Sequence, residues 1–280
     1  MINVKNTGYL LLFITIFLFA FAMKASHAGP SSDHDLITVS SQQDTLANAK
    51  YESNLNSLSD YLNNKGLQID ELIKDPRFEI YEEIGDRFRK SAERKSRGID
   101  EYKRILGFDV KSKKITEFID DNYDQLKKAE ETYGIPKYVI SAIIGIESDY
   151  GRNIGSYNPF NAYVSMYVVN YREDFAKAQL KELMEFVERN NLDVFELKSS
   201  YAGAMSYGQF IPYSINKWFV GEDIFDMNNN IMSVANYLAY FKERTGSIEK
   251  AVLRYNPSSL YTRAVLDLAE EAEKGFTSGR

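Results

Sequence analysis

The sequence predicts a mainly α-helical fold. Apolar residues recur at helical spacing within residues 115–129, 176–187 and 231–241, and charged side chains fill the opposite face of each stretch. No sustained run alternates apolar and polar residues, as a half-buried strand would. The chain also has no internal repeat and no heptad series, so neither a solenoid nor a coiled coil is indicated.

The N-terminal residues 1–28 have the pattern of a secretory signal peptide. Lys5 gives a positive start, residues 10–23 are apolar apart from Thr15, and Ser26 and Ala28 are small residues suited to cleavage after Ala28. The alternative is an uncleaved membrane anchor, but the apolar run is shorter than the roughly 20 residues that a spanning helix needs. In both cases we expect export to the periplasm or cell envelope.

The rest of the chain divides into three predicted parts. Residues 29–44 are polar and lack periodicity, which is typical of a flexible leader. Residues 45–110 are expected to form a charged N-terminal helical subdomain, and a soft boundary near residues 108–113 separates it from residues 111–272. This last part contains every unusual cluster of residues, so we expect it to be the catalytic domain.

Composition excludes several classes of function. The formal net charge of −6 argues against nucleic acid or an anionic membrane surface as a bulk partner. The chain has no cysteine, which rules out thiolate chemistry and a lipid-modified N-terminal Cys. Its two histidines are His27, in the signal, and His34, in the leader, so no imidazole base is expected in the folded part. With no nucleotide-binding glycine motif either, we expect an enzyme without a cofactor that uses carboxylates, hydroxyls and amides.

Glu147 is the leading candidate for such chemistry. Pro136 is expected to begin a helix and Gly151 to end it. The residues three, four and seven positions before Glu147 are isoleucines, so its carboxyl group continues an apolar stripe in the last helical turn. Burial and the helix dipole should both raise its pKa, as a proton-donating glycosidase acid requires. The alternative is a boundary residue that reaches solvent or pairs with Arg152.

Four ordered motifs accompany Glu147 and carry a family resemblance. They are Glu147-Ser148-Asp149-Tyr150-Gly151-Arg152, the segment 200–212 (SYAGAMSYGQFIP), Ser233-Val234-Ala235-Asn236-Tyr237, and the segment 254–261 (RYNPSSLY). This set resembles the lytic murein transglycosylases of the membrane-bound B type, over residues 65 to 272. The resemblance implies a lysozyme-like catalytic domain that acts on peptidoglycan glycan strands.

The resemblance also implies roles for individual residues. Glu147 corresponds to a single catalytic acid/base that cleaves the MurNAc-GlcNAc β-1,4 bond and leaves 1,6-anhydromuramyl ends. The residues placed around the bound sugars are Ser200, Gln209, Tyr237, Tyr255, Asn256, Tyr261 and, in a shortened segment, Arg172. A monomer is expected, with other cell-wall enzymes as candidate partners.

Two departures from the family pattern bear on the site. Ser206 stands where a glycine is expected, while Gly203 and Gly208 keep the backbone able to approach a flat ligand, or are plain turn residues. Residues 218–226 lack the spaced ligands of a calcium-binding EF-hand loop, so we expect no metal site. Tyr237 is as compatible with a core position as with sugar binding.

Two other functions remain open from the sequence. A hydrolase would need a second carboxylate, and Asp149 is a poor partner because, two positions along the helix, it faces a different side. Other acids that could serve are Glu173, Asp174, Glu222, Asp223 and Asp226. A glycan-binding protein without turnover is the second alternative, and retention of Glu147 on an apolar face argues against it.

Overall fold

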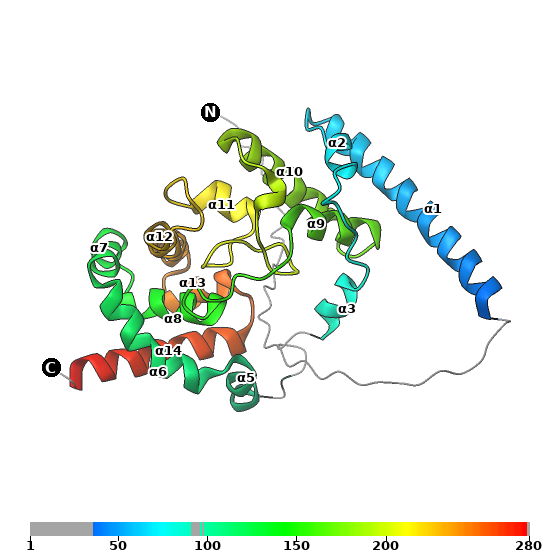
Figure 1. Cartoon of the computed structure of the whole chain (residues 1–280). Helices are drawn as coiled ribbons and strands as arrows, with labels where there is room; N and C mark the ends of the chain where they lie inside the picture. Colours follow the sequence, from blue (N-terminus) through cyan, green and yellow to red (C-terminus); the bar gives the residue numbers. More distant parts are fainter. Residues whose placement is uncertain (1–35, 91–95, 97, 279–280) are drawn as a thin grey trace, which may run out of the picture.

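The computed structural model describes residues 36–90, 96 and 98–278, and helices make up most of this part of the chain (Figure 1). The helices are α1 (Leu36–Asn63), α2 (Asp70–Ile73), α3 (Ile84–Arg89), α5 (Ile99–Leu106), α6 (Phe108–Asp121), α7 (Tyr123–Tyr133), α8 (Lys137–Ser148), α9 (Pro159–Val168), α10 (Glu173–Asn190), η1 (Val194–Glu196), α11 (Pro212–Trp218), α12 (Met227–Thr245), α13 (Ile248–Tyr255) and α14 (Ser259–Ser278). Apart from three isolated bridges, these residues form no β-structure. The prediction of a mainly α fold is therefore confirmed.

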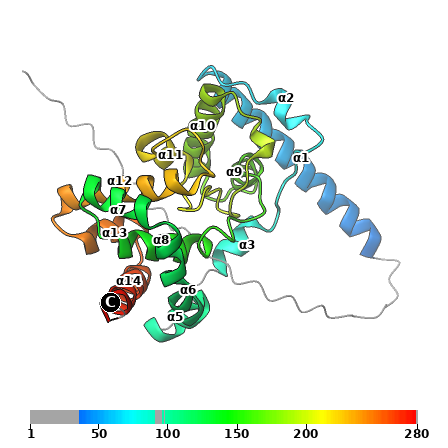
Figure 2. The same cartoon turned by 60° about the vertical axis from the view of Figure 1, so that its left-hand side comes forward.

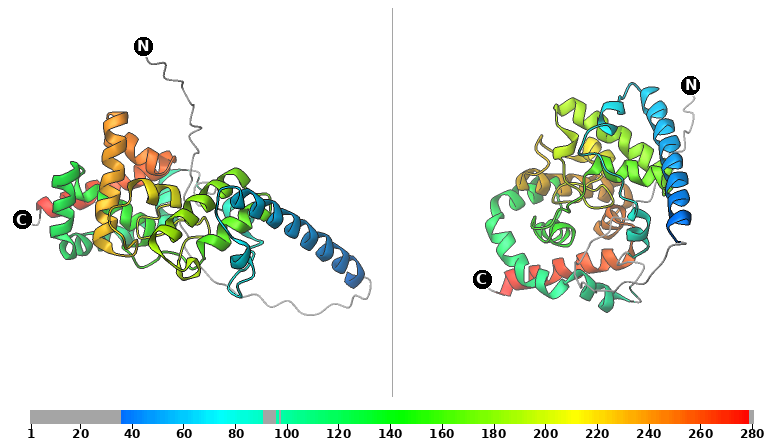
Figure 3. Two further views of the ribbon diagram at one scale, coloured as in Figure 1. Left: turned by 90° about the horizontal axis from the view of Figure 1, so that it is seen from above. Right: turned by 45° about the vertical axis from the view of Figure 1, so that its right-hand side comes forward.

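The helices form two groups that meet at an irregular segment, residues 199–211. One group packs around α8 and contains α5, α6, α7, α12, α13 and α14 (Figures 1 and 2). In the other, α1, α3 and α10 pack against α9, and α11 packs against α10. Contacts between α11 and α12 connect the two groups. The long helix α1 runs along α9 and extends beyond it (Figure 3).

Helix α8 is the central element, because α6, α7, α12 and α14 all contact it. Every residue from Val139 to Ser148 is buried. A helix that is apolar on all sides is expected in the middle of a bundle, since no face of it gains from contact with water. The sequence of α8 thus places its one acidic side chain, Glu147, inside the protein.

The ends of α8 differ slightly from the prediction. Pro136 is the residue before the first helical position, and the helix ends at Ser148. Asp149 and Tyr150 follow with φ values of 51° and 60°, so the left-handed conformation that stops the helix occurs before Gly151. The prediction that Gly151 ends the helix was wrong because Asp149 adopts the left-handed conformation that glycine usually supplies, which aspartate tolerates better than most residues.

Two predicted domain boundaries also need correction. Residues 36–44 of the predicted leader belong to α1, since this stretch includes Leu36, Ile37 and Val39 and contains no glycine or proline that would break a helix. The boundary between residues 110 and 111 falls inside α6, and the chain instead breaks at Gly107, whose φ is 66°. The predicted subdomain is also divided: α1 and α3 pack on α9, whereas α5 packs on α6 and α14.

The predicted signal peptide, residues 1–28, lies outside the described residues. Within the described part of the chain, none of the helices has both the length and the apolar character needed to cross a bilayer.

Gly145 generates a stability prediction, because a methyl group at this position would lie 2.5 Å from the Tyr150 ring. Alanine is normally favoured over glycine inside a helix by about 1 kcal/mol. Here we expect Gly145→Ala to lower the free energy of unfolding by about 1–3 kcal/mol, since Tyr150 is buried and must move. Gly275→Ala is the control, because nothing lies within 4 Å of its added carbon. Urea denaturation of both variants measures the effect; a Gly145→Ala protein as stable as the Gly275→Ala one would contradict the packing argument.

Candidate active site

Glu147 lies in the last turn of α8 with only 2% of its surface exposed. The hydroxyl of Tyr261, in the first turn of α14, donates a hydrogen bond of 2.7 Å to Glu147 Oε1. Tyr261 is itself fully buried. A residue 114 positions along the chain therefore holds the carboxyl group in one orientation, in a site from which water is largely excluded.

Two buried tyrosines near Glu147 are held in their protonated form. Burial raises the pKa of Tyr261 well above its usual value, and the negative charge of Glu147 raises it further. The same two causes, in the same order, raise the pKa of Tyr255. Since both phenols keep their protons at physiological pH, each can act as a hydrogen-bond donor whatever the ionisation state of Glu147.

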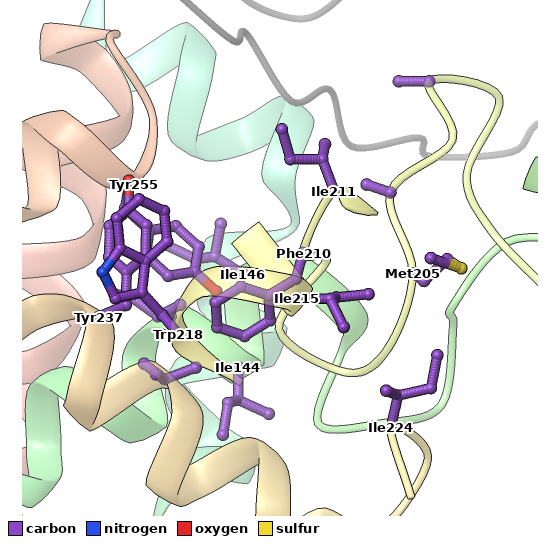
Figure 4. Close-up of a cluster of buried hydrophobic side chains, with 14 of the residues drawn as sticks. Ile144, Ile146, Met205, Phe210, Ile211, Ile215, Trp218, Ile224, Tyr237 and Tyr255 are labelled. Carbon is purple, nitrogen blue, oxygen red and sulfur yellow. The ribbon is translucent and has the colours of Figure 1, made fainter. Parts of the chain in front are cut away.

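Tyr255 and Tyr237 belong to an aromatic cluster next to the carboxyl group. The two rings lie edge to face at 4.9 Å, and Phe210 contacts both. Trp218 packs on Tyr237 at 4.9 Å, and Figure 4 shows these rings gathered beside Phe210. The Tyr237 hydroxyl donates to the carbonyl of Arg254. Tyr237 is thus part of the core, as the alternative interpretation allowed, and its contact with Tyr255 also places it beside the candidate site.

The segment 199–211 forms two tight turns in front of this cluster. In the first turn Gly203 N–H donates to the carbonyl of Ser200, and in the second Gln209 N–H donates to the carbonyl of Ser206. The bridges between Ser199 and Met205, and between Met205 and Phe210, close the turns. Gly203, Ser206 and Gln209 all have left-handed backbones, with φ values of 77°, 69° and 52°.

The glycines of this segment make room for the protein's own aromatic rings. A methyl group on Gly203 would lie 2.2 Å from the Tyr163 ring, whose hydroxyl donates to the Gly203 carbonyl. A methyl group on Gly208 would meet Phe210 at 2.6 Å and the Tyr255 hydroxyl at 2.9 Å, and that hydroxyl donates to the Gly208 carbonyl. The two glycines were expected to let a ligand approach the backbone closely. In the structure, the hydroxyls of Tyr163 and Tyr255 occupy these close positions.

The predicted sugar-binding residues fall into two sets. Ser200 and Gln209 lie in the two turns, where Ser200 Oγ accepts from Ala204 N–H and Gln209 Nε2 donates to the Ser206 and Ile154 carbonyls. The second set comes from the C-terminal helices: Tyr237 lies in α12, Tyr255 ends α13, and Tyr261 lies in α14. The buried Asn256 directly follows Tyr255, in the link between α13 and α14.

Arg172 lies among side chains that pack on the first turn: Phe88 contacts Tyr201, and Arg172 acts electrostatically on Tyr163, whose hydroxyl bonds to the Gly203 carbonyl. Arg172 precedes α10 in a left-handed conformation, and its guanidinium lies over the rings of Phe175, at 4.2 Å, and Phe88, at 5.8 Å. These contacts belong to the group of helices around α9. The contacts of Arg172 described here therefore do not join it to Glu147, and its role in sugar binding stays a prediction.

A charged cluster at the carboxyl end of α8 was not predicted from the sequence. Lys111 of α6 donates a hydrogen bond of 2.7 Å to the carbonyl of Gly145 and lies 3.7 Å from Asp149 Oδ1. Lys114 donates to Asp149 Oδ2 at 2.8 Å. The sequence did contain a signal, since Lys111 comes four positions before Ile115 and so falls on the apolar stripe of its helix.

The loop between α11 and α12 uses its acids for local structure. The Asp226 side chain caps α12 by accepting from Asn229 N–H, and Asp223 accepts from Phe225 N–H. Among the described residues, no group of three or more His, Cys, Asp or Glu side chains is placed to hold a metal ion. The absence of a calcium requirement stays a prediction.

Solved structures with this arrangement of helices are bacterial lytic transglycosylases. Catenated SltB1 from Pseudomonas aeruginosa matches with a TM-score of 0.69 at 23% identity, over 80% of this chain and 97% of that chain. Slt35 from Escherichia coli, in complex with bulgecin A, matches with a TM-score of 0.68 at 20% identity, over 79% of this chain and 93% of that chain. The fold is therefore of the lysozyme-like helical class seen in these enzymes, as predicted.

A family model narrows this class. The transglycosylase SLT domain model matches residues 49–252, so the chain belongs to this family. Membrane-bound lytic murein transglycosylase B of Escherichia coli is 34% identical over 122 residues, which are 41% of this chain and 34% of that protein. The match thus spans about a third of the relative's length. Because the family match ends at residue 252, the assignment of Tyr255, Asn256 and Tyr261 rests on the sequence motif and on their geometry.

The hydrogen bond from Tyr261 gives the test of this site. We expect Tyr261→Phe to lower kcat for murein cleavage about ten- to a hundredfold, because a hydrogen bond to a charged group contributes about 1.5–3 kcal/mol. KM separates the two roles given to Tyr261: it should change little where the hydroxyl acts through Glu147, and a raised KM would instead support the predicted sugar contact. Steady-state kinetics on purified murein measure both constants. Tyr133→Phe, on the half-buried Tyr133 of α7, is the control. An unchanged kcat in a folded Tyr261→Phe protein would show that this hydrogen bond has no part in turnover.

Proposed function

We propose that this protein is a lytic transglycosylase that cleaves the MurNAc-GlcNAc β-1,4 bond of peptidoglycan, with Glu147 as the single acid/base. The observation that carries the proposal is the buried Glu147 carboxyl group, held by the Tyr261 hydroxyl and close to Tyr255, whose hydroxyl bonds to the Gly208 carbonyl of the second turn. Membership of the transglycosylase SLT domain family supports the same activity. The glycan-binding alternative is weaker, because sugar binding alone does not require a carboxyl group in such a position.

Relatives support the choice of substrate. The structure of SltB3 from Pseudomonas aeruginosa, a match with a TM-score of 0.69, is of a complex with NAG-NAM-pentapeptide. A second structure of SltB3 holds NAG-anhNAM-pentapeptide. We propose peptidoglycan glycan strands as the substrate of this chain too, with Ser200, Gln209, Tyr237, Tyr255, Asn256 and Tyr261 around the sugars and Arg172 as a further contact. Amide and hydroxyl groups of this kind can donate to and accept from sugar hydroxyls and acetamido groups.

In the proposed mechanism Glu147 acts twice. Its carboxyl proton passes to the glycosidic oxygen, so the GlcNAc residue leaves as an alcohol while positive charge develops at the anomeric carbon of MurNAc. The 2-acetamido carbonyl of MurNAc stabilises that charge. The 6-hydroxyl oxygen then bonds to the anomeric carbon and gives its proton to the Glu147 carboxylate. The 1,6-anhydro ring closes, the acid is regenerated, and no water is consumed.

A hydrolase is the second candidate, and the ion pairs of Asp149 count against it. Asp149 follows the end of α8 in a left-handed conformation, and its carboxylate bonds to Lys114 on α6. Of the other acids considered, Asp223 and Asp226 bond to backbone amides, and Glu173, Asp174 and Glu222 are exposed. A carboxylate that is already bonded to lysine or to backbone amides, as those of Asp149, Asp223 and Asp226 are, is less suited to activate water. The 6-hydroxyl of MurNAc is part of the reacting sugar itself and therefore has a large effective concentration at the anomeric carbon.

Digestion of murein in ¹⁸O-labelled water, in buffer containing EDTA, tests the proposed reaction. We expect unlabelled products with 1,6-anhydromuramyl ends, lighter by one water than hydrolysis products, because the new bond comes from the substrate itself. Glu147→Gln is the matched control and should lose about 10²–10⁴-fold in activity or more while still binding murein. Mass spectrometry of the glycans gives the answer: label at the new ends would establish a hydrolase, and activity lost only with EDTA would reveal a metal requirement.

We also propose export to the periplasm or cell envelope, with cleavage after Ala28. The pattern of residues 1–28 supports export and cleavage. The description of the Escherichia coli relative as membrane-bound supports the envelope location alone. Intact-mass measurement of the exported protein should give a chain that begins at Gly29. A mass that retains residues 10–23 would instead indicate an anchor.

A further inference from the structure

Lys111 is a buried lysine that the proposed mechanism does not use. Only 7% of its surface is exposed, and it lies on the face of α6 that packs against α8. Burying an ammonium group is costly unless it is paired and hydrogen-bonded, so lysine is among the residues that are almost never fully buried. A lysine retained at such a position needs a compensating role.

The contacts of Lys111 all lie at the carboxyl end of α8. Its Nζ donates to the carbonyl of Gly145, two residues before Glu147, at 2.7 Å. Carbonyl groups in the last turn of a helix carry partial negative charge, which a cation offsets. The Tyr150 hydroxyl donates back to the Lys111 carbonyl at 2.8 Å. Because Tyr150 also packs on Gly145, the lysine and the tyrosine together fasten the turn that carries Glu147.

Charge couples Lys111 to Glu147 as well. Burial lowers the pKa of Lys111, while the negative charges of Asp149 and Glu147 act in the opposite direction. This interaction is mutual, so the ammonium group favours the ionised form of Glu147 to the same extent. The titratable and charged groups of this region come from every element packed around the end of α8. They are Tyr261 from α14, Tyr255 from α13, Tyr102 from α5, Lys111 and Lys114 from α6, and Asp149, Tyr150 and Arg152 after α8; Tyr237 of α12 packs on Tyr255.

We propose that Lys111 is a positioning residue for Glu147: it fixes the last turn of α8 and supplies a positive charge that stabilises the carboxylate once the proton has left. The inference rests on the proposed acid/base role of Glu147. That residue must release its proton inside a buried site, where an unpaired negative charge is unfavourable. Lys111 lowers this cost from α6, through its contact with the carbonyl of Gly145 in the last turn of α8.

The pH profile of kcat/KM tests this role. Lys111→Met removes the charge and keeps an apolar side chain of similar length, and the Gly145 carbonyl retains its bond from Asp149 N–H. Without the ammonium group the carboxylate is less stable, so we expect the alkaline limb, where Glu147 loses its proton, to move up relative to that of the wild-type enzyme. KM should stay close to that of the wild-type enzyme. Lys137→Met is the matched control, because Lys137 is half-buried at the other end of α8, about 15 Å from Glu147.

An alkaline limb that stays in place would overturn the proposal, even if activity fell, because a purely structural lysine would produce that result. If Lys111→Met does not fold, Lys111→Gln decides, since glutamine carries no charge but has an amide N–H that can still donate to the Gly145 carbonyl. Its alkaline limb should also move up, and an unmoved limb would again refute the inference. Failure of the proposed function is separately visible, because Glu147→Gln would then keep its activity.

Discussion

The burial of one carboxyl group at the carboxyl end of α8 is the constraint on which the surrounding structure depends. An acid in that place is disfavoured twice, by loss of water and by the partial negative charge of the last helical turn. The helices α6, α12 and α14 pack on α8 and so keep solvent away from its last turn, and the protein compensates from two directions: the Tyr261 hydroxyl bonds to the carboxyl group, and Lys111 bonds to the last turn. Each compensating group comes from a different part of the chain, so the complete fold is needed before Glu147 is held in place.

The tyrosines around Glu147 have a structural and a chemical role at once. Tyr255 and Tyr261 fill buried space as large apolar rings, and their hydroxyls bond to the Gly208 carbonyl and to Glu147. A phenylalanine would fill the same volume but would remove one hydrogen bond from each of these oxygens, at a cost of about 1–3 kcal/mol each. Gly208 makes the contact with Tyr255 possible, because a side chain at position 208 would collide with the Tyr255 hydroxyl. Gly203 has the same role for Tyr163 in the first turn. Side chains of the core thereby contact both the turns proposed to bind sugar and the helix that carries Glu147.

Local patterns predicted more of this structure than contacts between distant residues. The apolar stripe before Glu147 was sufficient to predict its burial, because helical periodicity depends only on neighbouring residues. Helical spacing could not predict that Tyr261, 114 positions away, would be the hydrogen-bond partner of Glu147. The family motif placed Tyr261 at the same site, and the structure shows the hydrogen bond between the two. Lys111 was missed because a lysine on an apolar stripe is usually taken as a boundary residue. The helix stop at Asp149 was missed because the left-handed conformation is less common for residues other than glycine.

Ser206 shows how the tertiary structure overrides local preference. Its φ of 69° explains why a glycine is expected there, since a side chain in the left-handed region costs about 1 kcal/mol or more. Its hydroxyl is buried and has no hydrogen-bond partner within the described part of the chain, which adds to the cost. The turn persists because Met205 bridges to Phe210 and Gln209 bonds twice to the Ser206 carbonyl. The contacts of Met205 and Gln209 on either side of Ser206 therefore set the shape of this segment, and the residue at position 206 does not. For this reason a serine can stand where a glycine is expected without loss of the two turns.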